Sequence, residues 1–397
     1  MPRLLLFAAT TGYQIHSFDS AARRAGASLT LATDRCHVLD DPWGDRAIPV
    51  KFDRPAESLA ALRGLSFDGI CAVGDHPAVL AAYAAQALGL PFHPPAAALA
   101  AHDKLRARAL YRAAGLPVPD FFEASAEDAS RAPYPCVLKP IGGAASRGVI
   151  RADDPDEFHA AFARIRRMGE DRIQCERYIP GPEFAVEAIM TAGRLHPLAI
   201  FDKPDPMEGP YFEETIYTTP SRASGSVQRD LLDAVARASA ALGLRHGPVH
   251  AELRYNSAGA WILETHARPI GGLCSRALRF VGDLSLEDLI VRHALGQDVA
   301  SIPRDPLASG VMMIPIPRPG IYESVEGAEA AAAVPGIDDV VITAKPGQHL
   351  LQLPEGSTYL GFLFSRASTP ADVEQSLRQS HAALRFHIAT ALETLRS

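Results

Sequence analysis

The ten residues LETHARPIGG, at positions 263–272, place three side chains able to hold a ligand at every second position. These are Glu264, His266 and Arg268, and they follow an apolar run that ends near Ile262. Because alternate residues of a strand point to the same face, we expect the three to share one face with Ile262. A carboxylate in such a row can bind a divalent cation, and a guanidinium can hold a carboxylate or phosphate through two hydrogen bonds.

A second alternating run, HGPVHAELRYN, precedes this stretch and is joined to it by a turn-rich segment at 256–260. The spacing predicts an antiparallel hairpin that places Glu252 opposite Glu264. The same register places Leu253 opposite Leu263. Opposed carboxylates lie roughly 4.5–5.5 Å apart at Cβ and repel unless a cation lies between them, which makes Mg²⁺ the candidate metal. A solvated surface hairpin is the alternative, but the flanking runs are too apolar for a freely solvated face.

Lysine is rare in this chain and is therefore a second guide to its chemistry. The 39 basic residues include only five lysines, at positions 51, 104, 139, 203 and 345. Lys139 lies in a strand-like run, CVLKPI, and the loop that follows contains Gly142, Gly143, Ser146 and Gly148. Glycines let backbone N–H groups approach an anion, so this segment predicts a phosphate-binding loop with Lys139 at its base. The loop lacks the Walker spacing, and a glycine-rich hairpin without a ligand is the alternative.

The elements that must position these residues fall into three parts. Residues 1–96 alternate short apolar runs with amphipathic helical segments, which predicts a parallel sheet built from βαβ units. The first loop has no GxGxxG, which disfavours a dinucleotide site. Next, a helix bounded by prolines carries Lys104 and ends at Gly115. The last part, 310–397, has strand and helix patterns but no cluster of chemically active residues.

Length and composition restrict the class of protein. A chain of 397 residues is expected to form about two or three domains. The net charge of −7 lacks the basic excess of nucleic-acid-binding proteins, and the N-terminal apolar run is far shorter than the ~20 residues of a membrane span. We therefore expect no nucleic acid and no membrane, and a cytoplasmic location. Five cysteines without CxxC spacing argue against disulfides and structural zinc, and we expect them to be reduced and mostly buried: Cys36, Cys71, Cys136, Cys175 and Cys274.

Taken in order, these motifs resemble those of the ATP-grasp superfamily, in its carboxylate-amine ligase branch, which includes the biotin-carboxylase-like L-amino acid ligases. The segments that carry the resemblance are AAQALGLP with HDK, CVLKPIGGAASRGV, ERYIPGPEF, and HAEL with LETHARP. The resemblance implies an α/β ATP-grasp fold in three parts. These are an N-terminal Rossmann-like (preATP-grasp) domain at 1–96, a central ATP-grasp domain at 97–309 with a mobile lid at about 117–182, and a C-terminal α+β lobe at 310–397.

The resemblance also implies roles for individual residues. The cofactor ATP would be bound by Lys104, Lys139, Gly142, Gly143, Ser146 and Gly148 at the phosphates, by Glu176 and the backbone near Tyr178 at the adenine, and by Glu183 at the ribose. Glu252 and Glu264 would bind Mg²⁺, with Mn²⁺ as an alternative metal, and Arg268 would steady the acyl phosphate. Asparagine is usual where this chain has His266. Imidazole is a poorer magnesium ligand than an amide oxygen, so His266 is a candidate metal ligand, catalytic base or structural residue.

These roles predict an ADP-forming ligase that joins a carboxylic acid or amino acid to an amine through an acyl phosphate. One alternative is an ATP-grasp enzyme of carboxylase or nucleotide-pathway type that activates bicarbonate or formate, and another is a nucleotide-binding sensor without catalysis. Candidate substrate contacts flank the metal strands at Lys203, Glu213, Glu214, Gly271 and Gly272. The partners we expect are a small-molecule carboxylate and an amine, and the C-terminal lobe is a candidate surface for a homodimer.

Overall fold

The N-terminal part is a parallel sheet with helices packed on it, as predicted. The computed structural model describes residues 1–10, 12–34 and 47–390, so Cys36 lies outside the described residues. The first sheet has the order β3-β2-β1-β4, and β1 pairs in parallel with β2 and β4. Its strands are β1 (Arg3–Ala8), β2 (Ser28–Thr33), β3 (Ile48–Pro49) and β4 (Gly69–Val73), and its helices are α1 (Ile15–Arg24), α2 (Pro55–Ala60) and α3 (Asp75–Leu88).

Two short helices connect this part to the rest of the chain. The sequence predicted one helix here, but the structure has α4 (Pro95–His102) and α5 (Lys104–Ala113). Asp103 separates them because its backbone is extended, and its carboxylate accepts a hydrogen bond of 2.9 Å from the backbone N–H of Arg106. An aspartate that does this caps a helix N-terminus. Lys104 is therefore fixed as the first residue of α5.

The segment predicted as a lid forms a small sheet of its own, with the strand order β5-β8-β6-β7. Helix α6 (Pro155–Arg167) buries Phe158, Ala161 and Ile165 in the same hydrophobic cluster as Leu138 and Cys175 of the sheet. The strands are β5 (Phe121–Glu123), β6 (Cys136–Pro140), β7 (Ile150–Ala152) and β8 (Ile173–Arg177), and a 3-10 helix, η1, spans Ala126–Arg131.

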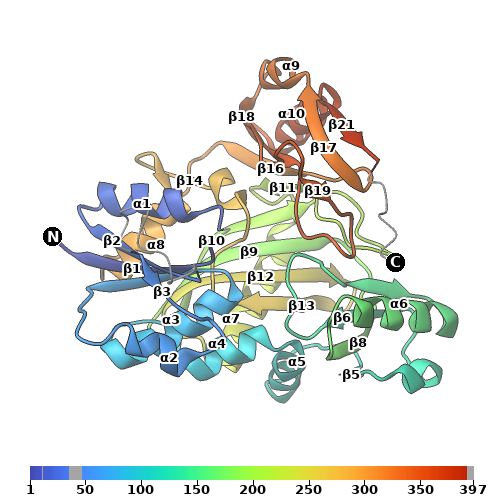
Figure 1. The fold of residues 1–397 in the computed structure, drawn as a ribbon, viewed down its shortest axis with the longest axis horizontal. Helices are drawn as coiled ribbons and strands as arrows, with labels where there is room; N and C mark the ends of the chain where they lie inside the picture. The colour runs from blue at the N-terminus through green and yellow to red at the C-terminus, as the bar shows by residue number, and fades with distance from the viewer. Residues whose placement is uncertain (11, 35–46, 391–397) are drawn as a thin grey trace.

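An eight-stranded antiparallel sheet forms the centre of the molecule, in the order β13-β12-β9-β10-β11-β16-β20-β18. Figure 1 shows the N-terminal sheet, the lid and the C-terminal lobe arranged around the long strands β9, β10, β12 and β13. The strands are β9 (Glu183–Thr191), β10 (Arg194–Lys203), β11 (Ile216–Thr219), β12 (Gly247–Asn256), β13 (Gly259–His266), β16 (Ala308–Ile314), β18 (Ile337–Ile342) and β20 (Gly361–Ala367). The sheet runs across the division predicted at 309/310, because β11 pairs with β16.

The remaining elements cover the faces and ends of this sheet. Helix α7 (Gly225–Leu242) contacts β13, α8 (Leu286–Ala294) contacts α1, and α10 (Pro370–Ala382) contacts β16 and β20. A three-stranded sheet in the C-terminal lobe has the order β19-β17-β21. Its strands are β17 (Gly320–Glu326), β19 (His349–Leu350) and β21 (Arg385–Ala389); the other short elements are α9 (Ala328–Ala332), η2 (Cys274–Ala277), β14 (Arg279–Phe280) and β15 (Leu284–Ser285).

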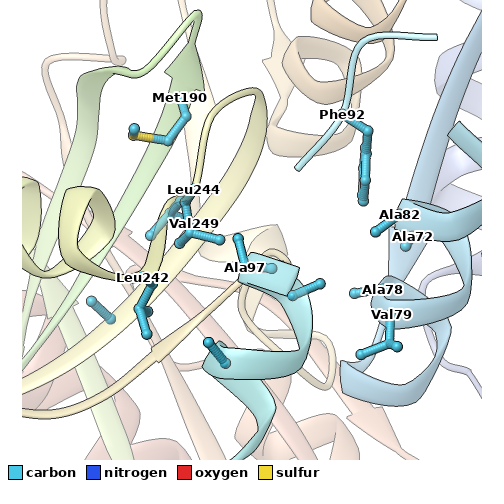
Figure 2. Close-up of a cluster of buried hydrophobic side chains, with 14 of the residues drawn as sticks. Ala72, Ala78, Val79, Ala82, Phe92, Ala97, Met190, Leu242, Leu244 and Val249 are labelled. Atoms are coloured by element: carbon cyan, nitrogen blue, oxygen red, sulfur yellow. The ribbon is translucent and has the colours of Figure 1, made fainter. Parts of the chain in front are cut away.

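One hydrophobic cluster joins the N-terminal part to the central sheet. Figure 2 shows Val79 and Phe92 of the N-terminal part, Ala97 of α4, Leu242 of α7 and Val249 of β12, all members of this cluster. Because these side chains leave water together, the two parts share one core.

The lid also contacts the C-terminal lobe. Arg164 of α6 forms a two-point ion pair with Glu355, in which one N–O distance is 2.9 Å. The backbone N–H of Gly148 donates to the carbonyl oxygen of Pro354 at 2.9 Å. These contacts hold the glycine loop and the lobe together.

The described cysteines are free and buried, as predicted: Cys71, Cys136, Cys175 and Cys274. Among the described residues, no helix combines the length and the apolar character that crossing a bilayer requires.

His93 links the N-terminal part to β12 as a neutral side chain. Its Nδ1 accepts a hydrogen bond of 3.1 Å from the backbone N–H of Arg245, and its Nε2 donates to the carbonyl oxygen of Pro248 at 3.0 Å. Burial lowers the pKa of His93 to about 4 from the ordinary value of 6.5. The unfolded chain therefore binds this proton at a higher pH than the folded chain. The contribution of His93 to stability is complete above pH 6.5 and is lost as the pH falls toward 4.

The substitution His93→Gln tests this linkage, because glutamine keeps a donor and an acceptor but does not titrate. Between pH 7 and pH 4 the wild-type chain is expected to lose roughly 3 kcal/mol more unfolding free energy than the variant. Urea denaturation at several pH values measures the difference, with His349→Gln, an exposed position, as the control. A difference between H93Q and wild type that does not change with pH contradicts the prediction.

Candidate active site

A cavity of about 630 Å³ lies where the N-terminal part, the lid, the central sheet and the C-terminal lobe meet. Most of the predicted site residues line it: Lys104, Lys139, Gly142, Gly143, Ser146, Glu176, Tyr178, Glu183, Glu214, Glu252, Glu264, His266, Arg268, Gly271 and Gly272. The fold thus brings four separate sequence motifs to one cavity.

Three predicted residues do not line this cavity, and their placement is corrected. Gly148 has φ +71°, and an added Cβ would lie 2.9 Å from the ring of Pro140, so this glycine shapes the loop from outside the cavity wall. Lys203 is buried behind the carboxylates that line the cavity. Glu213 is exposed and faces a separate small hollow beside Leu351.

The register of the hairpin is partly as predicted. Glu252 and Glu264 lie directly opposite each other on β12 and β13, which confirms their pairing. The predicted pair of Leu253 with Leu263 is wrong, because a bulge places Leu253 opposite Ile262. The turn between the strands has two residues, 257 and 258, rather than five.

The bulge also corrects the predicted face of Ile262. This side chain is 1% exposed and belongs to the hydrophobic core, whereas Leu263 lines the cavity. The row of polar side chains therefore consists of Glu264, His266 and Arg268, and it begins immediately after the bulged residue, Leu263.

Glu176 is the centre of a buried ion-pair network. Its carboxylate lies 2.6 Å from Nζ of Lys139 and accepts hydrogen bonds from Arg108 at 2.9 Å and Gln174 at 2.7 Å. Burial by itself raises the pKa of Glu176, but Arg108 and Lys139 outweigh it and hold that pKa at about 2. Arg108 also donates to the carbonyl oxygen of Ile262 at 2.9 Å. It therefore joins α5, the lid strand β8 and the bulge of β13.

Lys104 contacts both the glycine loop and the hairpin. Its Nζ donates to the carbonyl oxygen of Gly143 and lies 3.4 Å from Oε1 of Glu264. At Gly142 an added Cβ would lie 3.3 Å from Nε2 of His102, which leaves little room for a side chain. Lys104 and Lys139 therefore both lie at the loop that was predicted to bind phosphates.

His266 lies between two carboxylates. Its Nδ1 is 2.9 Å from Oδ1 of Asp75, and its Nε2 is 3.1 Å from Oε2 of Glu264. Burial and Arg268 lower the pKa of His266, but Asp75 and Glu264 outweigh them and raise it. Both ring nitrogens of His266 already have a carboxylate partner, so neither is left over for a metal ion or a substrate proton. Of the three roles considered for His266, this geometry favours the structural one.

His250 repeats this arrangement on the neighbouring strand. Its Nδ1 contacts Glu187, and its Nε2 lies 3.3 Å from Oε1 of Glu252. Burial lowers the pKa of His250, but the two glutamates outweigh it and raise that pKa to about 9. His250 is paired with His266 in the register, and the two ring centroids are 5.8 Å apart. Each of the paired glutamates therefore has a histidine ring nitrogen beside it, from His250 at Glu252 and from His266 at Glu264.

Lys203 neutralises three carboxylates from within the protein. Its Nζ lies 2.7 Å from Glu183, 2.6 Å from Glu214 and 3.4 Å from Glu252. Oxygen atoms of these three glutamates lie within 4.8 Å of one another, a spacing that could hold a metal ion. Because the ammonium group already contacts all three, it supplies the positive charge that this cluster needs.

Arg268 makes a two-point contact with Asp75, the first residue of α3. Nε and one terminal nitrogen donate to the two carboxylate oxygens at 2.9 and 3.1 Å, and the other terminal nitrogen donates to the carbonyl oxygen of Pro269 at 3.0 Å. Asp75 belongs to the N-terminal part, so that part orients the guanidinium that lines the cavity.

Four residues of this site were missed by sequence reasoning: Asp75, Arg108, Glu187 and His250. Only His250 had a local signal. It lies two positions before Glu252 on β12, just as His266 lies two positions after Glu264 on the antiparallel strand β13. The other three reach the site from α3, α5 and β9, through tertiary packing.

Two regions of the chain match known domain families. Residues 132–277 match the ATP-grasp domain, and residues 312–389 match L-amino acid ligase C-terminal domain 2. Among solved structures, the L-amino acid ligase from Bacillus licheniformis is 25% identical, with a TM-score of 0.83 over 98% of this chain and 99% of that one. Phosphoribosylglycinamide synthetase from Anaerococcus prevotii, at 15% identity, shares the fold, with a TM-score of 0.72 over 98% and 99%.

Curated proteins show a more partial similarity. Carnosine synthase 1 from Gallus gallus is 31% identical over 294 residues, which are 67% of this chain and 30% of that protein. The chain covers 61%, 30% and 53% of three curated relatives, less than two thirds of each.

The fold and the cavity define an ATP-grasp protein. The chain belongs to the ATP-grasp superfamily, and its C-terminal lobe carries the domain type found in L-amino acid ligases. The predicted fold class and family are confirmed.

Proposed function

We propose that this chain is an ATP-dependent, ADP-forming ligase that joins the carboxyl group of an amino acid or related acid to an amine. The observation that carries the proposal is the pairing of Glu252 with Glu264 in a cavity that also presents Lys104, Lys139 and Arg268. Such a cavity offers oxygen ligands for a metal and positive charge for phosphates and a carboxylate. The similarity to an L-amino acid ligase over nearly the whole chain supports the same conclusion.

ATP binds, in this proposal, at the side of the cavity formed by the lid. Its adenine packs on an apolar surface lined by Val137, Val149, Ile179 and Leu263, and its ribose faces Glu183. Two neighbours of the same fold were solved with ATP or ADP. Within the described part of the chain, the Glu176 carboxylate is held by Lys139, Arg108 and Gln174. We therefore assign it the role of positioning Lys139, and leave recognition of adenine to the backbone near Tyr178.

The paired glutamates fit a magnesium ion by their chemistry. Both offer hard oxygen ligands, and the nearest lysine and histidine nitrogens lie at 3.1–3.4 Å, farther than the 2.6 Å contact of Lys139 with Glu176. The carboxylate oxygens of Glu252 and Glu264 are therefore held less tightly by neighbouring side chains than those of Glu176, and their lone pairs are more available to a metal ion. Mg²⁺ or Mn²⁺ held there would neutralise charge on the ATP phosphates.

The residues of this chain then have distinct tasks in two steps. In the first, a carboxylate oxygen attacks the γ-phosphorus, the bond to ADP breaks, and an acyl phosphate forms, while Lys104 and Lys139 offset the phosphate charge. In the second, the amine nitrogen attacks the acyl carbon, phosphate leaves, and the nitrogen loses a proton. Arg268 holds oxygens of the acyl group through both steps. The lid excludes water, which would hydrolyse the acyl phosphate.

Release of ADP across a panel of substrates tests the proposal. Purified protein with ATP and Mg²⁺ is expected to release ADP only when a suitable carboxylate is present, and to form an amide when an amine is added. Bicarbonate, formate and no substrate are the comparison arms. ADP release that bicarbonate or formate alone stimulates would favour the carboxylase-type alternative, and ATP binding without any turnover would favour a sensor.

The homodimer expected through the C-terminal lobe stays a prediction.

A further inference from the structure

The cavity has a second apolar surface that the nucleotide does not use. The surface assigned above to adenine comes from the lid and β13. The second is formed by Tyr13, which follows β1, and by Met313, Tyr359 and Phe362 of the C-terminal lobe. We call these four residues the aromatic wall. One adenine cannot cover both surfaces, so the wall is free for another ligand.

The wall is built around the ring of Phe362. Tyr13 and Tyr359 approach this ring edge-on, with centroid distances of 5.9 and 6.0 Å, and Met313 is its paired residue on the neighbouring strand β16. Edge-to-face rings of this kind form a stable apolar surface. The three rings and Met313 therefore form one continuous apolar surface.

Tyr13 leaves apolar area uncovered at this surface. It is 43% exposed, and the other large hydrophobic residues exposed in the described chain, which include Leu65 at 36%, do not line the cavity. Covering an exposed aromatic ring with an apolar group is favourable, by about 25 cal/mol per Å² of area removed from water. The wall thus favours a ligand with a large apolar group.

The wall adjoins the residue assigned to the acyl group. Gly272, four positions after Arg268, has φ +61°, and an added Cβ would lie 3.3 Å from the ring of Phe362. The loop that carries Arg268 therefore runs directly onto the wall. A carboxylate held by Arg268 has its own substituent within reach of Phe362.

A carboxylate with an uncommitted oxygen also lies next to the wall. Glu214 uses Oε1 to accept from both Lys203 and Tyr217 at 2.6 Å, and no described group is bonded to its Oε2. Glu214 and Tyr359 of the wall both line the cavity. An ammonium group on the same ligand can therefore donate to Glu214.

We propose that the acyl donor is an α-amino acid with a large apolar side chain. Its carboxylate faces Arg268, its ammonium group faces Oε2 of Glu214, and its side chain packs on the aromatic wall. This inference rests on the proposed ligase function and names the substrate class of that site.

Hydroxylamine in place of the amine substrate isolates the acyl donor, because it traps the acyl phosphate as a hydroxamate whatever the natural amine is. With ATP and Mg²⁺, kcat/KM for hydroxamate formation is expected to be at least tenfold higher for phenylalanine, leucine or methionine than for alanine or glycine. It is also expected to be at least tenfold higher for phenylalanine than for 3-phenylpropanoate, which lacks the ammonium group. Equal or better use of alanine, glycine or 3-phenylpropanoate would overturn the proposal.

Substitution of a wall residue tests whether the preference for a large apolar side chain depends on the aromatic wall. Tyr13→Ala is expected to lower the ratio of kcat/KM for phenylalanine over alanine at least fivefold, with the KM for ATP unchanged. Leu65→Ala, an exposed apolar residue of the same N-terminal part outside the cavity, is the matched control and is expected to leave the ratio unchanged. An unchanged ratio in Y13A contradicts the inference. If no carboxylate supports ADP release, the ligase function itself fails; if only other carboxylates do, this inference fails alone.

Discussion

Replacing Glu264 with glutamine is expected to lower kcat for ADP release about 10³-fold while the protein stays folded. Glutamine keeps the size of the side chain but removes one of the two facing carboxylates, so the proposed metal loses a charged ligand. The loss also frees Lys104 and His266, which lie 3.4 and 3.1 Å from this carboxylate. Steady-state ADP release, measured over a range of Mg²⁺ concentrations, tests the prediction.

The chain offers a matched control for this experiment. Glu213 was predicted to contact the substrate, but it lies outside the cavity wall. Glu213→Gln is expected to retain wild-type turnover. Near-normal turnover in E264Q, or an equal loss in both variants, would show that Glu264 is not a metal ligand.

The second large effect is expected for Arg268→Lys, which should retain ATP binding but lose most amide formation, by about 10²–10³-fold. The planar guanidinium of Arg268 is held by both oxygens of Asp75, and a lysine ammonium cannot reproduce this two-point contact. The missing interaction belongs to the acyl phosphate stages rather than to docking of the nucleotide. The ATP affinity and the substrate-dependent ADP release should be measured in parallel.

Arg24 provides the matched control, because it makes a similar two-point contact with Asp288 at 2.8 and 2.7 Å and does not line the cavity. Arg24→Lys is expected to leave both measurements unchanged. A role for Arg268 at the acyl group is ruled out if R268K loses ATP affinity and turnover together, or if it loses neither.

The pairing of Glu252 with Glu264 could be predicted because it depends on two local signals, period-2 alternation and a turn between the two runs. The bulge in β13 could not be predicted from the sequence. Sequence reasoning assumed a turn of five residues, whereas the strands extend to a turn of two residues. The extra residue, Leu263, accounts for that difference, so Glu252 and Glu264 are paired as predicted while Ile262 is turned into the core.

The ion-pair partners of the site residues show a second limit of prediction from sequence. The rarity of lysine directed attention to Lys104 and Lys139, which do line the cavity, but the same signal placed Lys203 at a ligand. Its burial behind three carboxylates depends on β10 lying between β9 and β11, which no local pattern encodes. Asp75 is equally hidden, since its partner Arg268 is 193 positions away along the chain. Periodicity describes one element at a time, whereas such pairs are made when elements pack.

The pairing of β11 with β16 has a consequence for engineering this chain. A chimera that exchanged the C-terminal lobe as a cassette would cut the central sheet between these strands, and the incoming lobe would have to re-form the four paired positions from Ile216 to Thr219. Met313, Tyr359 and Phe362 of the aromatic wall would move with the graft, whereas Tyr13 would stay with the N-terminal part. Redesign of the substrate preference is therefore better attempted by point substitutions at Tyr13 and Tyr359, which lie outside the strands, than by recombination of whole lobes.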